Sequence, residues 1–242
     1  MSITIKRLPS LLTLLLILGL SAQATVLVAP NANAGTNGNA VQYGIFGNGT
    51  IGENVTFQFD MAASQLTPMV GSEITAVGFR LPGGASTIPS ATTIGPYSIT
   101  LSGSLNSLGS LSATPSNNIA PGAVSVYNAT LVIPANALVG GSGPNPFFLI
   151  NFTTPYNYSG GDLLVTLSYS MQAALGVDAN GVDSLGDTSV CLGGYCAAEY
   201  FNYPITEFQY SGTAPTPEPG TLALFGSGIL GLAGVLRRKI NL

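Results

Sequence analysis

The stretch from Val55 to Met61 decides the fold; it reads VTFQFDM and alternates large apolar residues with polar ones. Successive side chains of a β-strand point to opposite faces, so this alternation predicts a half-buried strand. Glycine- and proline-rich clusters that favour turns separate this stretch from similar ones. The same pattern recurs at residues 77–81, 97–101, 124–133, 148–152 and 163–169.

Many short strands joined by such turns predict an all-β fold, namely an antiparallel β-sandwich that is jelly-roll-like. The spacing of the strands also fits a β-barrel, and nothing in the sequence selects closure. Residues 61–66 predict one short helical turn.

The charged residues are few and unevenly placed. Between Thr25 and Pro219 the chain has one cation, Arg80, against all ten acids. Phosphate binding needs clustered lysine and arginine, so we expect no nucleic-acid partner.

The absence of certain residue types restricts the chemistry. The 242 residues include no histidine, which excludes a Ser-His-Asp triad and an imidazole metal site. A pair of carboxylates, as in glycoside hydrolysis, remains the one enzymatic alternative. We expect a protein that is not an enzyme and has no cofactor.

The C-terminal segment has three successive parts. Pro217-Glu218-Pro219 precedes an apolar run from Thr221 to Leu236, and Arg237, Arg238 and Lys239 follow. The prolines favour an extended, exposed backbone that a protease can accept. The 16 apolar residues give roughly 24 Å of helix, slightly less than the hydrocarbon core of about 30 Å.

Within that predicted transmembrane helix, small residues form one face that lets another helix approach closely in lipid. The cations mark its cytoplasmic end and stop translocation. An ordinary permanent anchor is the alternative, but it leaves Pro-Glu-Pro unexplained. The small-residue face consists of Gly226, Gly228, Gly231 and Gly234.

The order of these parts, from Pro217 to Lys239, resembles the PEP-CTERM sorting signal of Gram-negative bacteria. The resemblance implies an exported substrate of exosortase, a membrane enzyme, in an organism that makes exopolysaccharide and biofilm. The exported part resembles, more loosely, uncharacterised domains of other PEP-CTERM proteins at residues 55–65, 74–80 and 154–166.

The N-terminus predicts a signal peptide. Lys6 and Arg7 precede an apolar segment at 11–20, and Ala22-Gln23-Ala24 fits the cleavage site of signal peptidase. The mature chain is expected to begin at Thr25. The predicted organisation is a signal peptide at 1–24, a β-sandwich domain at 25–210, a Pro/Thr linker with the Pro-Glu-Pro motif at 211–219, and the transmembrane helix with its basic tail at 220–242.

Two local clusters are candidate sites. Cys191 and Cys196 are the only cysteines, and an exported protein lies in an oxidising compartment, which predicts a disulfide. Asp178, Asp183 and Asp187 gather oxygen ligands suited to calcium, but their spacing does not match an EF-hand. A polar turn is the favoured interpretation of these aspartates.

These features predict an exported envelope or biofilm-matrix protein with a structural or adhesive role. The alternative is a carbohydrate-binding module for an exopolysaccharide, using exposed tyrosine faces. We expect a transient anchor in the inner membrane, followed by release to the periplasm, the cell surface or the extracellular matrix. The candidate sugar-binding tyrosines are Tyr156, Tyr158, Tyr200 and Tyr203.

Overall fold

A computed structural model describes residues 24–46, 54–170, 175–181, 189–192 and 202–211. These residues belong to one compact unit, Ala24–Ser211. The predicted signal peptide, the Pro-Glu-Pro motif, the C-terminal helix and its basic tail lie outside the described residues. Among the described residues, no helix is long and apolar enough to cross a membrane.

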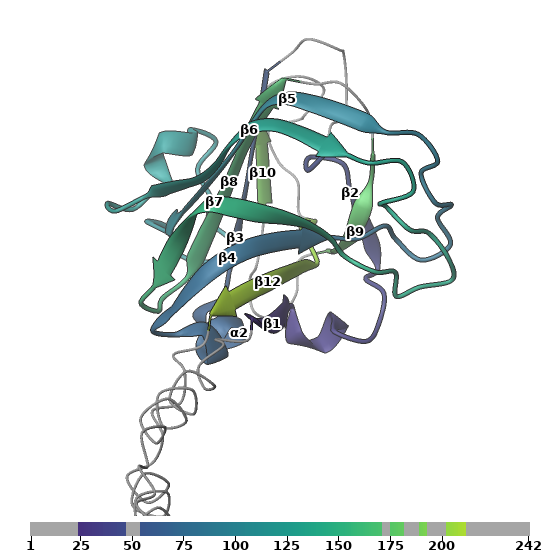
Figure 1. Ribbon diagram of the computed structural model, residues 1–242. Helices are drawn as coiled ribbons and strands as arrows, with labels where there is room; N and C mark the ends of the chain where they lie inside the picture. The colour runs from purple at the N-terminus through teal and green to yellow at the C-terminus, as the bar shows by residue number, and fades with distance from the viewer. Residues whose placement is uncertain (1–23, 47–53, 171–174, 182–188, 193–201, 212–242) are drawn as a thin grey trace, which may run out of the picture. The chain divides into compact units, whose positions relative to one another are not determined.

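The described residues form twelve strands in three antiparallel sheets, which confirms the prediction of an antiparallel β fold. The four-stranded sheet has the order β1-β12-β4-β7, the five-stranded sheet has the order β10-β3-β8-β5-β6, and a small sheet has the order β11-β9-β2 (Figure 1). The strands are β1 (Ala24–Ala29), β2 (Ala40–Gln42), β3 (Asn54–Met61), β4 (Ser72–Phe79), β5 (Thr92–Gly103), β6 (Val124–Ile133), β7 (Phe148–Tyr158), β8 (Leu163–Ser170), β9 (Val177–Asn180), β10 (Ser189–Leu192), β11 (Tyr203–Pro204) and β12 (Thr206–Ser211).

Pairing between the strands of the two larger sheets is nested. β5 pairs with β6, β4 with β7, β3 with β8 and β1 with β12, so each pair encloses the previous one along the chain. Successive pairs fall alternately in the five-stranded and four-stranded sheets. This is the connectivity of a jelly roll, with β10 added beside β3.

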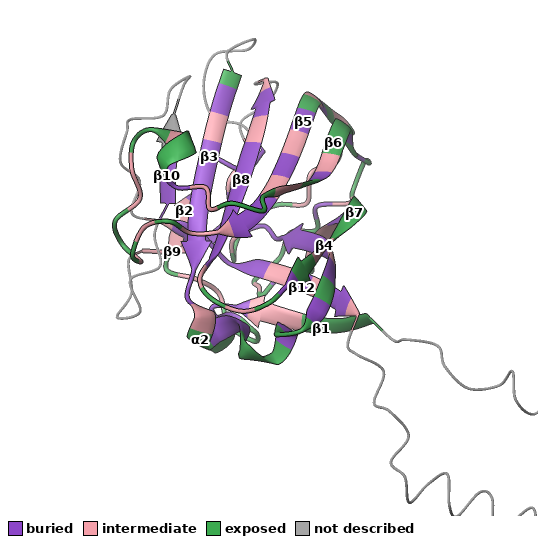
Figure 2. Cartoon of the chain, turned by 90° about the vertical axis from the view of Figure 1, so that its left-hand side faces the viewer, coloured by how far each residue is buried: buried purple, intermediate pink, exposed green. Residues whose placement is uncertain are grey.

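The inner faces of the two larger sheets share one hydrophobic core. Phe59 of β3 meets Phe79 of β4 edge to face, with ring centroids 6.3 Å apart. Such aromatic pairs contribute beyond the area that they bury. From Tyr97 to Leu101 of β5, burial alternates as the period of two predicts, and Figure 2 shows alternating bands on this strand.

The predicted helical turn at 61–66 corresponds to α2 (Ala63–Leu66), which continues into a 3-10 turn, η2 (Thr67–Met69). Two further 3-10 turns are η1 (Asn31–Asn33) and η3 (Pro115–Asn117). The six strands predicted from alternation are all present. β1, β2 and β9 to β12 were not predicted. Four of these six strands have only two to four residues, which is too short for a period of two to be recognised, and they form through pairing with other strands.

The outer face of the five-stranded sheet is partly covered, which the alternation did not predict. Gln58 and Asp60 point away from the inner apolar residues of β3, but both are fully buried. The loop at 104–120 supplies the cover: Asn118 Nδ2 donates to Gln58 Oε1 at 2.7 Å, and Gln58 Nε2 donates to the Pro115 carbonyl at 3.2 Å.

Candidate functional site

The site begins at Arg80, the residue that follows β4. The alternation of 77–81 predicts Arg80 on a polar face, yet only 1% of its surface is exposed. Burying a charge is costly unless it is paired and hydrogen-bonded. The contacts of Arg80 meet that requirement.

Asp178 of β9 is the partner of Arg80. Arg80 Nε donates to Asp178 Oδ2 at 2.9 Å, and this carboxylate is equally buried. The Asp178 amide also donates to the Arg80 carbonyl at 2.8 Å. The two residues are therefore joined through both side chains and backbone.

The remaining contacts of this ion pair hold the segment that follows β1. Arg80 Nη2 donates to the carbonyls of Asn33 and Thr36, and the guanidinium lies 4.9 Å from the centre of the Phe147 ring. Asp178 Oδ1 accepts a hydrogen bond from the Gly38 amide at 3.0 Å. The ion pair therefore fastens residues 33–38 and β9 to the end of β4.

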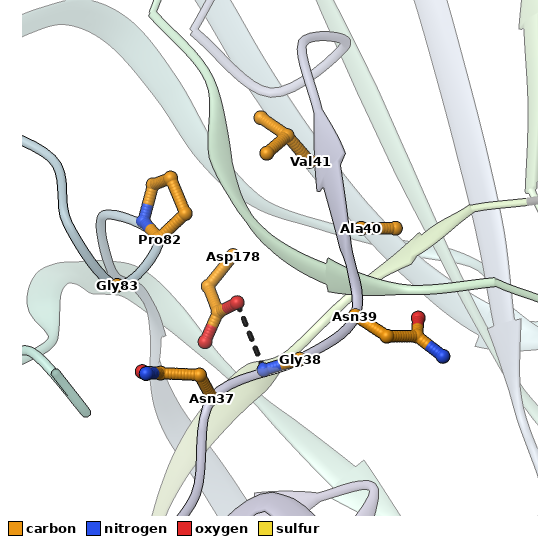
Figure 3. A pocket seen from close by; sticks show the side chains of 8 residues that line it. All are labelled: Asn37, Gly38, Asn39, Ala40, Val41, Pro82, Gly83 and Asp178. Carbon is orange, nitrogen blue, oxygen red and sulfur yellow. Dashed lines mark hydrogen bonds between the residues drawn. The ribbon is translucent and has the colours of Figure 1, made fainter.

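A cleft of about 260 Å³ lies over Asp178 (Figure 3). Asn37 Nδ2 donates to the Ser142 carbonyl at 3.2 Å, whereas its Oδ1 is buried with no hydrogen-bond partner among the described residues. Asp178 is the one charged residue of the lining, and Arg80 balances its charge. It comprises Asn37, Gly38, Asn39, Ala40, Val41, Pro82, Gly83 and Asp178.

This arrangement places one of the three predicted calcium ligands in a different role. Asp178 is a strand residue whose two carboxylate oxygens already accept hydrogen bonds. Asp183 and Asp187 lie outside the described residues, so the calcium site stays a prediction. The described part of the chain contains no group of three or more acidic, cysteine or histidine side chains that could hold a metal.

The tyrosines proposed as sugar platforms do not share one surface. Tyr158 and Tyr203 are buried in the core, so neither presents a ring face to a ligand. Tyr156 is half-buried, and Tyr200 lies outside the described residues. The tyrosine-based form of the carbohydrate hypothesis is wrong for Tyr158 and Tyr203, because both rings pack within the hydrophobic core.

Cys191 lies in β10, which pairs with β3, whereas Cys196 lies outside the described residues. The disulfide therefore stays a prediction.

The signal-peptide motif ends at Ala24, which is the first residue of β1 and pairs with Ser211 at the end of β12. Ala22 precedes the described residues.

Sequence reasoning missed the Arg80–Asp178 ion pair. The available sign was the isolation of Arg80, the single cation between Thr25 and Pro219, within an apolar stretch. Its partner is 98 residues away along the chain. No local pattern connects residues so far apart.

Comparison with known protein families finds the PEP-CTERM protein-sorting motif at residues 215–239. The chain carries a PEP-CTERM sorting motif at its C-terminus. The motif is associated with exosortase processing and implies an exported protein that is transiently anchored in the membrane. Searches of curated proteins and of solved structures found no match.

Proposed function

We propose that this PEP-CTERM protein is a structural or adhesive component of the cell envelope or biofilm matrix. The observation that carries the proposal is the sorting motif at 215–239, which begins shortly after a compact β unit that ends at Ser211. The motif supplies delivery, and the jelly-roll unit is the part delivered.

The chemistry of the jelly-roll unit supports a non-catalytic role. The chain has no histidine, and its one cation between Thr25 and Pro219 is buried in an ion pair. The cleft over Asp178 presents amides and a neutralised carboxylate rather than an activated nucleophile. Such a surface suits adhesion and packing in a hydrated matrix.

Replacement of Pro217-Glu218-Pro219 by three alanines in the native host tests the proposal. We expect wild-type protein to be shortened near Glu218 and to leave the inner membrane, because the prolines expose the backbone to exosortase. The variant should stay there with its C-terminus intact. Cell fractionation and mass spectrometry of the C-terminus measure both outcomes.

A matched control replaces Gly212 and Thr213, which precede the sorting motif at 215–239, with alanines. This variant should be processed as wild type. Wild-type protein that keeps Arg237 to Leu242 and stays in the inner membrane would show a permanent anchor and contradict the proposal.

A further inference from the structure

The outer face of the five-stranded sheet carries a second cleft, whose lining shares no residue with the cleft over Asp178. It has a volume of about 240 Å³, and strands β3, β5, β6 and β8 contribute its lining. The lining consists of Asn54, Val55, Thr56, Pro96, Ser98, Asn128, Ser168 and Tyr169. None of these residues is charged.

A row of polar side chains crosses this cleft at right angles to the strands. Thr56 is the register partner of Ser168, Ser168 of Ser98, and Ser98 of Asn128. We call these four residues the polar ladder. Thr56, Ser98 and Ser168 are half-buried, and Asn128 is exposed.

Hydrogen bonds hold the floor of the ladder in place. Thr56 Oγ1 and Ser168 Oγ are 3.3 Å apart, and Ser98 Oγ donates to the Ser168 carbonyl at 3.2 Å. A hydroxyl has one donor and two acceptor positions, so each can still bond to a ligand. The strands that carry them are packed on the core, which keeps the groups preorganised.

The neighbouring row on the same face shows what is distinctive about the ladder. There Gln58 donates to Thr166 Oγ1 at 2.9 Å, and Asn118 and Pro115 of the 104–120 loop cover the pair. The loop seals that row, whereas the polar ladder lines an open cleft. One half of the polar face is therefore closed and the other half is accessible.

We propose that the polar ladder binds a segment of an uncharged polysaccharide. Rows of hydroxyls and amides match sugar hydroxyls, which both donate and accept hydrogen bonds. An anionic chain would find no cation, because Arg80, the single cation between Thr25 and Pro219, is buried. The volume of this cleft is below the roughly 300–1,000 Å³ of pockets that enclose a small-molecule ligand. The cleft would therefore hold only a short part of a polysaccharide chain that lies across the strands.

This inference rests on the proposed function, since delivery to the envelope or matrix brings the domain to polysaccharide. A single weak site would gain strength when many copies contact one long chain. The ladder thus gives the proposed adhesive role a specific surface.

Native affinity electrophoresis of the full-length chain in detergent tests the ladder. The gels contain dextran, pullulan or laminarin as uncharged probes, or alginate as an anionic probe. We expect at least one uncharged probe to retard the protein and alginate to leave its mobility unchanged. The variant Thr56→Val/Ser98→Ala/Asn128→Ala should bind that probe at least tenfold more weakly.

The control is Asn151→Ala, which removes an exposed asparagine from β7 of the other sheet and should bind as wild type. Circular dichroism melts of each variant establish that it folds. Absence of retardation by all three uncharged probes overturns the inference, as does retardation unchanged by the triple variant in a folded protein. Either result leaves the proposed function standing if fractionation still places the processed protein outside the inner membrane.

Discussion

At the scale of single residues, the Arg80–Asp178 ion pair determines how the segment after β1 is held. Both side chains are buried, and between them they bond to Asn33, Thr36 and Gly38. A buried ion pair is not stabilising in itself, because desolvation offsets attraction. Removing one partner is different, since it leaves the other charge buried and unpaired.

The first prediction is that Arg80→Met lowers the free energy of unfolding by about 3–5 kcal/mol, the typical cost of breaking a buried pair. Asp178→Asn should also destabilise the protein, because it leaves the Arg80 guanidinium buried without an opposite charge. The double variant should lose less than the sum of the two single losses. Urea denaturation of all four proteins measures the coupling, and strictly additive losses would contradict the role of the pair.

Tyr158 gives the protein a pH-dependent stability. Burial, with a smaller contribution from the Asp162 charge, raises the pKa of Tyr158 to about 12. Its hydroxyl donates to the Gly161 carbonyl. An unfolded tyrosine ionises near pH 10, so between about pH 10 and 12 the unfolded chain binds fewer protons than the folded one.

The second prediction follows from that sign. The contribution of Tyr158 is fully present below about pH 10 and is lost as the pH rises toward 12. Tyr158→Phe should make stability fall less steeply over this range, although the loss of one hydrogen bond costs about 1 kcal/mol at every pH. Burial also raises the pKa of Tyr97, so part of the slope remains.

Urea denaturation at several pH values from 9 to 12 measures this slope. Tyr43→Phe is the control, because Tyr43 is 43% exposed. An identical slope in wild type and Tyr158→Phe would rule out the effect.

At the scale of elements, β12 completes the four-stranded sheet. It is the last strand of the compact unit, yet it lies between β1, the first strand, and β4. Phe208 and Tyr210 of β12 are buried in the core. The sheet therefore cannot form until the end of the domain is available.

The third prediction is that a chain ending at Ile205 fails to fold, whereas a chain ending at Ser211 folds. Loss of β12 leaves β1 without its partner and exposes the edge of β4, and unpaired strand edges promote aggregation. Circular dichroism melts and size-exclusion chromatography compare the two chains. A cooperative melt of the shorter chain at an unchanged temperature would contradict a central role for β12.

At the scale of the whole molecule, the two ends of the compact unit lie together. Ala24 pairs with Ser211, so the predicted cleavage site of signal peptidase lies beside the last residue of β12. Because Ala24 and Thr25 both belong to β1, the bond between them is part of a paired strand once β12 is in place. We therefore expect removal of the signal peptide to precede closure of this sheet.

The fourth prediction concerns that order of events. Full-length precursor refolded in detergent should resist purified signal peptidase, because a protease requires an unpaired, extended substrate. The precursor ending at Ile205 should be cleaved quickly, since β1 then lacks its partner. Mass spectrometry of the N-terminus measures both rates. Equal cleavage of the two precursors would show that pairing with β12 does not protect the site.

Some of this molecule follows from the sequence alone. The period of two in segments such as 55–61 and 163–169 is local and predicts strands, and β3 and β8 lie at those positions. The sorting motif is also readable from the sequence, since its three parts are contiguous. Neither inference requires knowledge of which segments meet in space.

Tertiary structure alone decided the rest. Short strands such as β2, β9 and β11 carry too few residues for a period and exist through their partners. Gln58 is buried because the 104–120 loop covers it, and Arg80 is buried because Asp178 neutralises it. Burial of a polar group depends on partners distant in the chain, and only the folded molecule brings those partners together.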